Sequence, residues 1–229
     1  MSTFLTLCSD VARESGAVGS APATVLAQTG RQGKVVQWVR QAWEQIQADN
    51  PYWNFLRAEF QGTLTINDMS YAPADLGITD FAAWVVDTDA YDPVTIYASG
   101  DQANEATLQF LPYQSWRTAY NRGAPVAMKP VYWSIAPDQS FNVGPKPDAA
   151  YIVRGEYQRS PQTLAVDGDV PTMPARFHDA IVWRAIMMLA EHDEAPVAYS
   201  VALRKYGAIL LNMERDLLPA IDLSGNALA

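Results

Sequence analysis

The spacing of apolar residues changes twice along this chain, and this change limits the folds open to it. Near both ends, apolar residues recur every three or four positions, which predicts helices. Between Glu59 and Ser160 they recur at every second position, which predicts strands. Strands and helices do not alternate, which disfavours a parallel nucleotide-binding sheet. We therefore expect an α+β fold in which the N- and C-terminal helices pack together as a helical bundle, and a central antiparallel, β-rich, sandwich-like subdomain projects from it.

Helix start and stop signals place the helical segments. Residues 2–15 end at a glycine, and residues 31–49 form the clearest amphipathic helix. Two further helices begin at Pro174 and Pro196, because proline suits the first turn of a helix. The expected organisation is a helical domain of residues 1–58 and 173–218, a β-rich subdomain of residues 59–172 with one short helix near 112–120, and a C-terminal tail of residues 219–229.

Acidic residues outnumber basic ones, and the excess lies in the middle of the chain. The formal net charge is -9, and residues 61–172 contain six basic and thirteen acidic side chains. Such a surface does not bind a phosphate backbone, because that affinity needs clustered Lys and Arg. It would let DNA pass without adhering, although plain solubility explains the same charge.

Motifs that carry chemistry are missing from the sequence. There is no phosphate-binding glycine loop and no nucleophile elbow. The two histidines, His178 and His192, are 14 residues apart, which on one straight helix is about 21 Å, too far to share a metal ion. Cys8 stands alone on an apolar helix face, where a thiolate is disfavoured. We therefore predict no catalytic residue, no cofactor and no metal.

The segment from Arg176 to Pro196 is apolar almost all round in its interior, which predicts a helix buried on several sides. His178 and His192 are then the polar ends of a core helix. Arg184 interrupts the apolar run, so it should reach a carboxylate or emerge at a subunit interface. A cluster of aromatic residues is expected to lie mainly in the core, with a subunit interface as the alternative; its members are Trp38, Trp43, Tyr52, Trp53, Phe55 and Phe60.

Several stretches, in order from about Leu5 to Leu218, together resemble the head-to-tail adaptor (connector or neck) proteins of tailed bacteriophages. They are "KVVQWVRQAWEQIQ…NPYWNFLRAEF", "TDFAAW", "LPYQSWRTAY", "PVYWSIAPDQSFNVGPKPDAAYIVRGEYQRSP" and "PARFHDAIVWRAIMMLA". No single motif is diagnostic, and the order and spacing of the set carry the resemblance. This family has no catalytic signature.

The resemblance implies a structural virion protein made in the host cytoplasm and located at the virion neck. Its members form rings, commonly of twelve copies, beneath the portal, where they extend the DNA channel and provide a docking platform for the tail. The implied partners are the portal protein, copies of the chain itself, and tail or nozzle/stopper proteins, while DNA passes without specific binding. No membrane is implied.

We expect the portal or subunit interface to use Arg184 and the C-terminal end of the chain, namely Leu217, Leu218, Ile221, Leu223 and Leu228. Two other functions share the same sequence features. The first is a tail terminator or stopper ring protein, although terminal helical stripes argue mildly against it. The second is a hydrolase or a carbohydrate-binding module that uses His178, His192 or the tryptophans.

Overall fold

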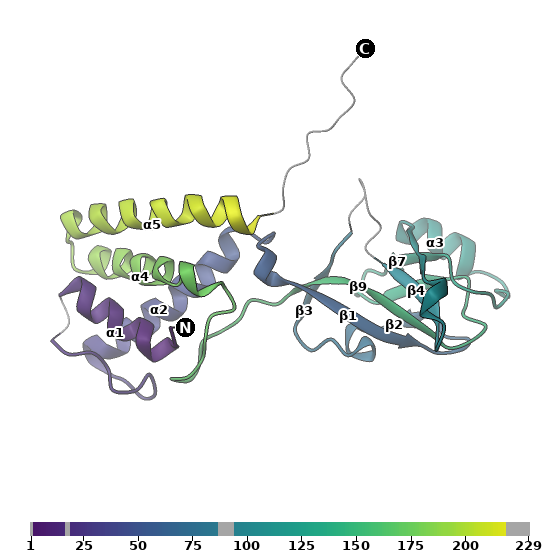
Figure 1. Cartoon of the computed structure of the whole chain (residues 1–229), viewed down its shortest axis with the longest axis horizontal. Helices are drawn as coiled ribbons and strands as arrows, with labels where there is room; N and C mark the ends of the chain where they lie inside the picture. The colour runs from purple at the N-terminus through teal and green to yellow at the C-terminus, as the bar shows by residue number, and fades with distance from the viewer. Residues whose placement is uncertain (1, 17–18, 87–93, 219–229) are drawn as a thin grey trace, which may run out of the picture. The chain divides into compact units, whose positions relative to one another are not determined.

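The computed structural model describes residues 2–16, 19–86 and 94–218, and it has the α+β fold expected from the sequence (Figure 1). The chain divides into two compact units. One contains Met1–Leu56 with Pro161–Ala229, and the other contains Arg57–Ser160. Helices dominate the first unit, and the second holds antiparallel-rich sheets.

The helical unit is built around one central helix. Its α-helices are α1 (Phe4–Ser15), α2 (Gly30–Asp49), α4 (Asp179–His192) and α5 (Pro196–Leu217), with the short 3-10 helices η1 (Asn54–Leu56) and η4 (Ala175–Phe177). Within this unit, α4 lies between α5 on one side and α1 with α2 on the other (Figure 1). This position explains why α4 is apolar almost all round, since a helix covered from several directions has little face left for water.

Local signals set the ends of these helices. The Thr3 side chain accepts a hydrogen bond from the Thr6 backbone nitrogen at 3.3 Å, which caps α1, and Gly16 ends that helix with a φ of 60°. At α5, Pro196 occupies the first turn, as its missing N–H allows. The predicted helix near 112–120 is α3 (Tyr113–Tyr120), in the other unit.

The β-rich unit contains two sheets. The first has the order β1 (Arg57–Leu64), β9 (Tyr151–Arg159), β4 (Thr95–Ala98) and β5 (Ala106–Thr107), and β3 (Phe81–Trp84) also pairs with β9. The second has the order β2 (Ser70–Tyr71), β8 (Phe141–Gly144), β7 (Tyr132–Ile135) and β6 (Gln109–Phe110). The short 3-10 helices η2 (Pro73–Leu76) and η3 (Gln102–Asn104) complete the unit.

Strand β9 organises the first sheet. It pairs with β1 along nearly its whole length on one side, and with β4 and β3 on the other. Its buried residues alternate with half-buried ones, as the period-two pattern predicts. Gly155 is one of the buried positions, and a Cβ there would lie 2.8 Å from the Phe60 ring. Glycine at this position therefore leaves room for the edge of the Phe60 ring against β9.

The aromatic cluster divides between the core and the surface. Trp43 and Trp53 are fully buried in the helical unit, and Phe60 lies in the core of the β-rich unit. Trp38 and Phe55 are partly buried and pack against the helical core, whereas Tyr52 is exposed.

The loop of residues 161–172 belongs to the helical unit and not, as expected, to the β-rich subdomain. Leu164 is fully buried in the helical core. The Asp167 carboxylate accepts hydrogen bonds from the Val25 backbone nitrogen at 2.6 Å and from the Thr24 hydroxyl at 3.0 Å. The loop therefore satisfies backbone and side-chain donors of the N-terminal segment, a pairing between residues far apart in sequence that local patterns do not reveal.

Candidate interaction surfaces

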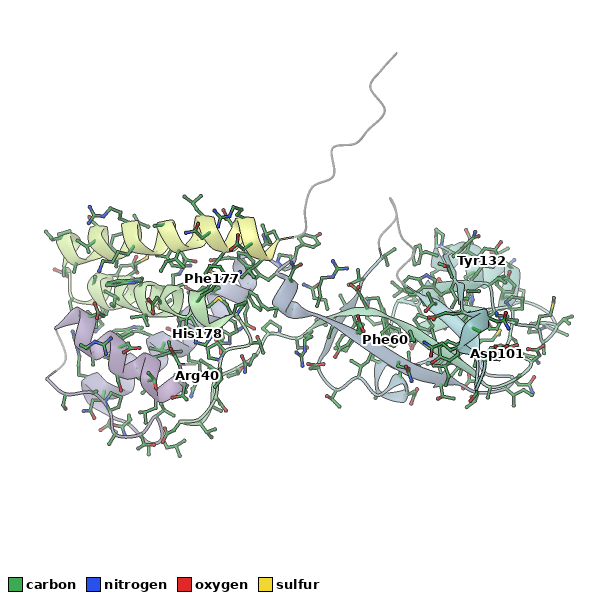
Figure 2. All side chains as sticks on the ribbon, in the orientation of Figure 1. Arg40, Phe60, Asp101, Tyr132, Phe177 and His178 are labelled. Atoms are coloured by element: carbon green, nitrogen blue, oxygen red, sulfur yellow. The ribbon has the colours of Figure 1, made fainter. Side chains whose placement is uncertain are left out.

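His178 is buried, which corrects the prediction that it forms a polar helix end. Its side chain is 1% exposed, and Nε2 lies 3.0 Å from the Met173 carbonyl oxygen. The residue lies just before α4, next to Phe177 (Figure 2). The preceding turn η4 folds against the core and brings His178 with it, so that the ring is buried with Nε2 hydrogen-bonded and Nδ1 without a partner among the described residues.

His192, at the other end of α4, belongs to a polar cluster that joins α4 to the start of α2. Lys34 Nζ donates to His192 Nε2 at 2.5 Å, and His192 Nδ1 donates to Asp193 Oδ1 at 2.9 Å. The ring meets Trp38 edge-on with 5.4 Å between centroids. Every polar atom of the imidazole is therefore used inside the helical unit.

Arg31 completes this cluster by an ion pair with Asp193. The hydrogen bond from Arg31 is the main reason that the pKa of Asp193 lies well below its usual range, and the His192 hydrogen bond acts in the same direction. This arrangement joins the start of α2 to the end of α4.

Arg184 reaches a carboxylate inside its own chain, one of the two outcomes predicted for it. Its Nε donates to Gln45 Oε1 at 3.1 Å, a terminal nitrogen lies 3.7 Å from Asp49 Oδ2, and the guanidinium lies 5.2 Å from the centroid of the Tyr206 ring. The side chain keeps 24% of its surface exposed. The Arg184 side chain is therefore already fixed by Gln45, Asp49 and Tyr206 of its own chain, and only its exposed part could contact another subunit.

The other predicted contact residues lie at the end of α5 and beyond it. Leu217 is buried in the helical core, and Leu218 is half-buried against it. Ile221, Leu223 and Leu228 lie outside the described residues.

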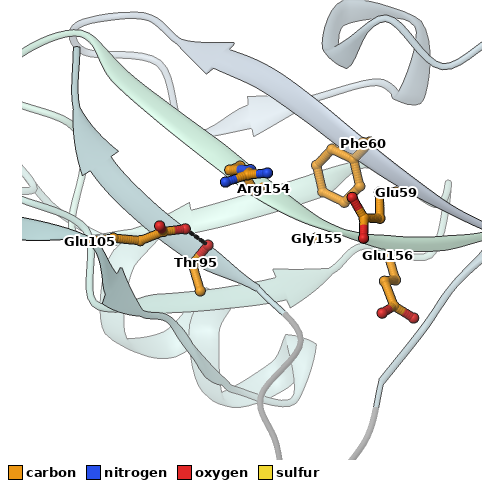
Figure 3. A pocket seen from close by; sticks show the side chains of 7 residues that line it. All are labelled: Glu59, Phe60, Thr95, Glu105, Arg154, Gly155 and Glu156. Carbon is orange, nitrogen blue, oxygen red and sulfur yellow. Dashed lines mark hydrogen bonds between the residues drawn. The ribbon is translucent and has the colours of Figure 1, made fainter. Parts of the chain in front are cut away.

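The first sheet of the β-rich unit carries a polar hollow of about 160 Å³ (Figure 3). Its lining residues are Glu59, Phe60, Thr95, Glu105, Arg154, Gly155 and Glu156. The Thr95 hydroxyl donates to Glu105, and Glu156 forms an ion pair with Arg57 at 2.5 Å. Small-molecule sites usually enclose at least about 300 Å³ of mostly apolar space. The hollow is therefore a poor candidate for a ligand site.

Among the described residues, no three His, Cys, Asp or Glu side chains come together as a metal site would require. Cys8 is fully buried, and burial raises the pKa of its thiol to about 12. No helix in the described ranges combines the length and apolar character needed to cross a membrane.

Four exposed apolar residues and one arginine form a stripe along α5. The stripe comprises Val197, Val201, Arg204, Ala208 and Leu211, and is called here the outer stripe. Val197 is 78% exposed and Leu211 is 69% exposed. Their spacing of four and three residues keeps all five side chains on one face of the helix.

The outer stripe was not predicted from the sequence. Apolar spacing marks the apolar residues of this helix as one set, yet α5 packs on α4 through Ala202, Tyr206, Met213 and Leu217. At 100° per residue, Tyr206 and Met213 point about 170° away from the outer stripe. A helical wheel of residues 196–217 would have separated the two faces.

A second exposed apolar group lies in the β-rich unit, in the loop between α3 and β7. It comprises Val126, Met128 and Val131 and is called here the loop patch. Val126 is 74% exposed. The Met128 backbone nitrogen donates to the Lys146 carbonyl oxygen at 2.9 Å, which fixes the loop beside the end of β8. Lys129 follows Met128 in the sequence, and this hydrogen bond brings Lys146 beside it. Two basic residues therefore lie next to the loop patch in a unit with an excess of acidic residues.

These features define a two-unit α+β protein with exposed apolar surfaces on both units. A family model described as SU10 adaptor protein matches residues 2–221. Because this match spans nearly the whole sequence, the chain belongs to the SU10 adaptor protein family, and the predicted resemblance is confirmed. It is a bacteriophage adaptor and a component of the virion. A search of curated proteins returned no match.

Proposed function

We propose that this chain is a structural head-to-tail adaptor that assembles as a ring beneath the portal of the filled head. Twelve copies would extend the DNA channel at the virion neck and provide the platform on which tail or nozzle proteins dock. The family match over residues 2–221 is the observation that carries this proposal.

The distribution of exposed apolar surface supports a role in assembly. The helical unit carries the outer stripe, and the β-rich unit carries the loop patch. Exposed apolar groups of this kind mark protein–protein contacts when they are contiguous. Two such surfaces on two units suit a protein that must bind different neighbours, namely its own copies, the portal and the tail.

The charge of the chain supports passage of DNA without adhesion. Residues 61–172 contain thirteen acidic and six basic side chains, and the whole chain has a formal net charge of -9. Acidic walls repel the phosphate backbone, so that DNA would move through the ring without being held.

Among the predicted contact residues, we propose that Leu218, Ile221, Leu223 and Leu228 meet the portal or a neighbouring subunit. Arg184 would contribute through the exposed part of its side chain. Leu217, the last residue of α5, would support the same contact by holding the end of the helix against the helical core, where its side chain is buried.

The test is a mass measurement of the chain alone and after mixing with purified portal rings and, separately, with purified tail tubes. We expect a complex with the portal whose mass corresponds to twelve added copies. Binding to the tail tube without binding to the portal would support the tail terminator or stopper function and would contradict the adaptor proposal.

A further inference from the structure

The outer stripe of α5 has the spacing of a helix face that packs against another protein segment. Successive members are separated by four, three, four and three residues, which is the heptad spacing of a coiled-coil seam. The opposite face of α5 already packs on α4, so the outer stripe is left without a partner among the described residues. Val197 and Leu211, near its two ends, are its most exposed large apolar side chains.

Arg204 stands in the middle of the outer stripe and carries an unpaired charge. No acidic side chain in the described part of the chain lies within ion-pair distance of it. The neighbouring cations of α5 are engaged, because Lys205 lies 3.8 Å from the centroid of the Trp183 ring and Arg215 pairs with Asp216 at 2.8 Å. A complementary segment should therefore offer apolar side chains together with one acid.

The residues that follow α5 have this composition. Residues 219–229 read "PAIDLSGNALA", in which Ile221, Leu223 and Leu228 are the large apolar residues and Asp222 is the single charged residue. Eleven extended residues span up to about 35 Å, and the outer stripe runs along about 21 Å of helix. The segment is long enough to cover the whole stripe.

The direction in which the chain leaves α5 favours a stripe on another copy. Leu218 has an extended backbone, with φ of -91° and ψ of 151°, and not the left-handed conformation that reverses a chain at a helix end. Pro219 follows it, and proline disfavours a helical conformation at the preceding residue. The described end of α5 therefore lacks the local signal that folds a chain back along its own helix.

We propose that residues 219–229 of one copy bind the outer stripe of α5 in a second copy. Ile221 and Leu223 pack against Ala208 and Leu211, and Asp222 pairs with Arg204 one turn before them, whose long side chain can reach an acid beside the apolar residues. A contact in which each copy gives its tail and receives another is heterologous, which is the kind that closes into rings. This inference rests on the proposed function only in assuming that copies meet.

Charge exchange in the full-length chain tests the ion pair. We expect Arg204→Glu to weaken self-association roughly fivefold, measured by sedimentation over a range of concentrations. Adding Asp222→Arg to Arg204→Glu should restore it. Lys205→Glu is the matched control, because it makes the same charge change on the same helix away from the stripe. Equal effects of Arg204→Glu and Lys205→Glu, or no rescue by the double change, would overturn the proposal.

Cysteine cross-linking distinguishes a second copy from the same chain. One tagged chain carries Leu223→Cys and a differently tagged chain carries Leu211→Cys, and the two are mixed at high concentration under oxidising conditions. We expect a mixed cross-linked dimer, and none when Gln41→Cys on the exposed face of α2 replaces Leu211→Cys. A chain that carries both Leu223→Cys and Leu211→Cys and links only to itself would show that the tail binds its own helix, contrary to the proposal.

The two proposals fail in different ways. If the portal binds Arg204→Glu normally and the mixed dimer is missing, the tail contact is wrong and the adaptor function stands. If the mixed dimer forms but the portal does not bind the unaltered chain, the tail contact stands and the adaptor function is wrong.

Discussion

The guanidinium of Arg184 lies over the ring of Tyr206, 5.2 Å from its centroid, and so joins α4 to α5 by a contact between a cation and an aromatic face. The same side chain donates to Gln45 of α2. Burial raises the pKa of the Tyr206 hydroxyl, so this ring remains neutral beneath the cation. Arg184 therefore connects three helices, which explains a charged residue inside an apolar run.

Replacing Arg184 should destabilise the helical unit. Arg184→Met keeps an aliphatic side chain but removes the hydrogen bond to Gln45 and the charge over Tyr206, so we expect a loss of about 1 kcal/mol in the free energy of unfolding. Urea unfolding measures this change. Arg13→Met, whose ion pairs are exposed at the surface, is the control and should cost less than about 0.5 kcal/mol. If Arg184→Met changes portal binding while leaving the free energy of unfolding intact, the residue acts at an interface instead.

The sequence predicted those features that depend on local spacing. The bounds of α2, the short helix α3 and the strand β9 follow from apolar periodicity and from proline and glycine signals. It did not predict that His178 would be buried, because that depends on how η4 folds against a distant part of the chain. The parallel pairing of β6 with β7 was equally hidden, since two-residue strands carry no period.

The candidate surfaces were harder to predict than the helices that carry them. The sequence indicated the apolar residues of α5 but not which of them face the core, because only the packing on α4 decides this. The loop patch gave no periodic signal. The absence of catalytic motifs was visible from the sequence, but a motif search cannot find a surface that is defined by exposure.

Cys8 should be almost inert in the folded chain. Burial raises the pKa of its thiol to about 12, so only about one thiol in ten thousand is ionised at pH 8. We expect alkylation by iodoacetamide at pH 8 to be roughly a thousandfold slower than in urea, where the thiol has an ordinary pKa. Mass spectrometry of the labelled fraction over time measures the rate. Rapid labelling of the native chain would contradict the position of Cys8 in the core.

Acid should weaken the connection between α2 and α4. The pKa of Asp193 is lowered mainly by the hydrogen bond from Arg31, so its stabilising effect is complete above the unfolded carboxyl pKa of about 4 and is lost as the pH falls through the lower folded value. We expect Asp193→Asn to cost about 1 kcal/mol at pH 7, where the ion pair is formed. The difference between the two proteins should be smaller at pH 2 than at pH 7. Urea unfolding at the two pH values checks the sign, and a difference that grows in acid would exclude this account.

Two glycines should respond in opposite directions to the same substitution. A Cβ at Gly62 would lie 2.5 Å from Leu76 Cδ2 and 3.1 Å from Leu76 Cα, so Gly62→Ala must displace η2 from β1. We expect it to cost about 2 kcal/mol, as overpacked positions do. Gly207, inside α5, has nothing within 4 Å of the same position, so Gly207→Ala should add about 0.5–1 kcal/mol of stability. Thermal unfolding of both variants tests the pair, and destabilisation by Gly207→Ala would mean that the middle of α5 is more crowded than described.

DNA should bind this chain weakly even at low salt. Affinity for a phosphate backbone comes from clustered cations that release counterions, and residues 61–172 contain thirteen acidic against six basic side chains. We expect no shift of a short duplex in a gel assay at low ionic strength, where electrostatic attraction is strongest. Neutralising the two lysines beside the loop patch with Lys129→Gln and Lys146→Gln should change nothing, because they lie in a unit with an excess of acidic residues. If the unaltered chain binds DNA tightly and in a salt-sensitive way, and the double variant does not, the region around the loop patch contacts DNA. That result would contradict a channel that repels DNA.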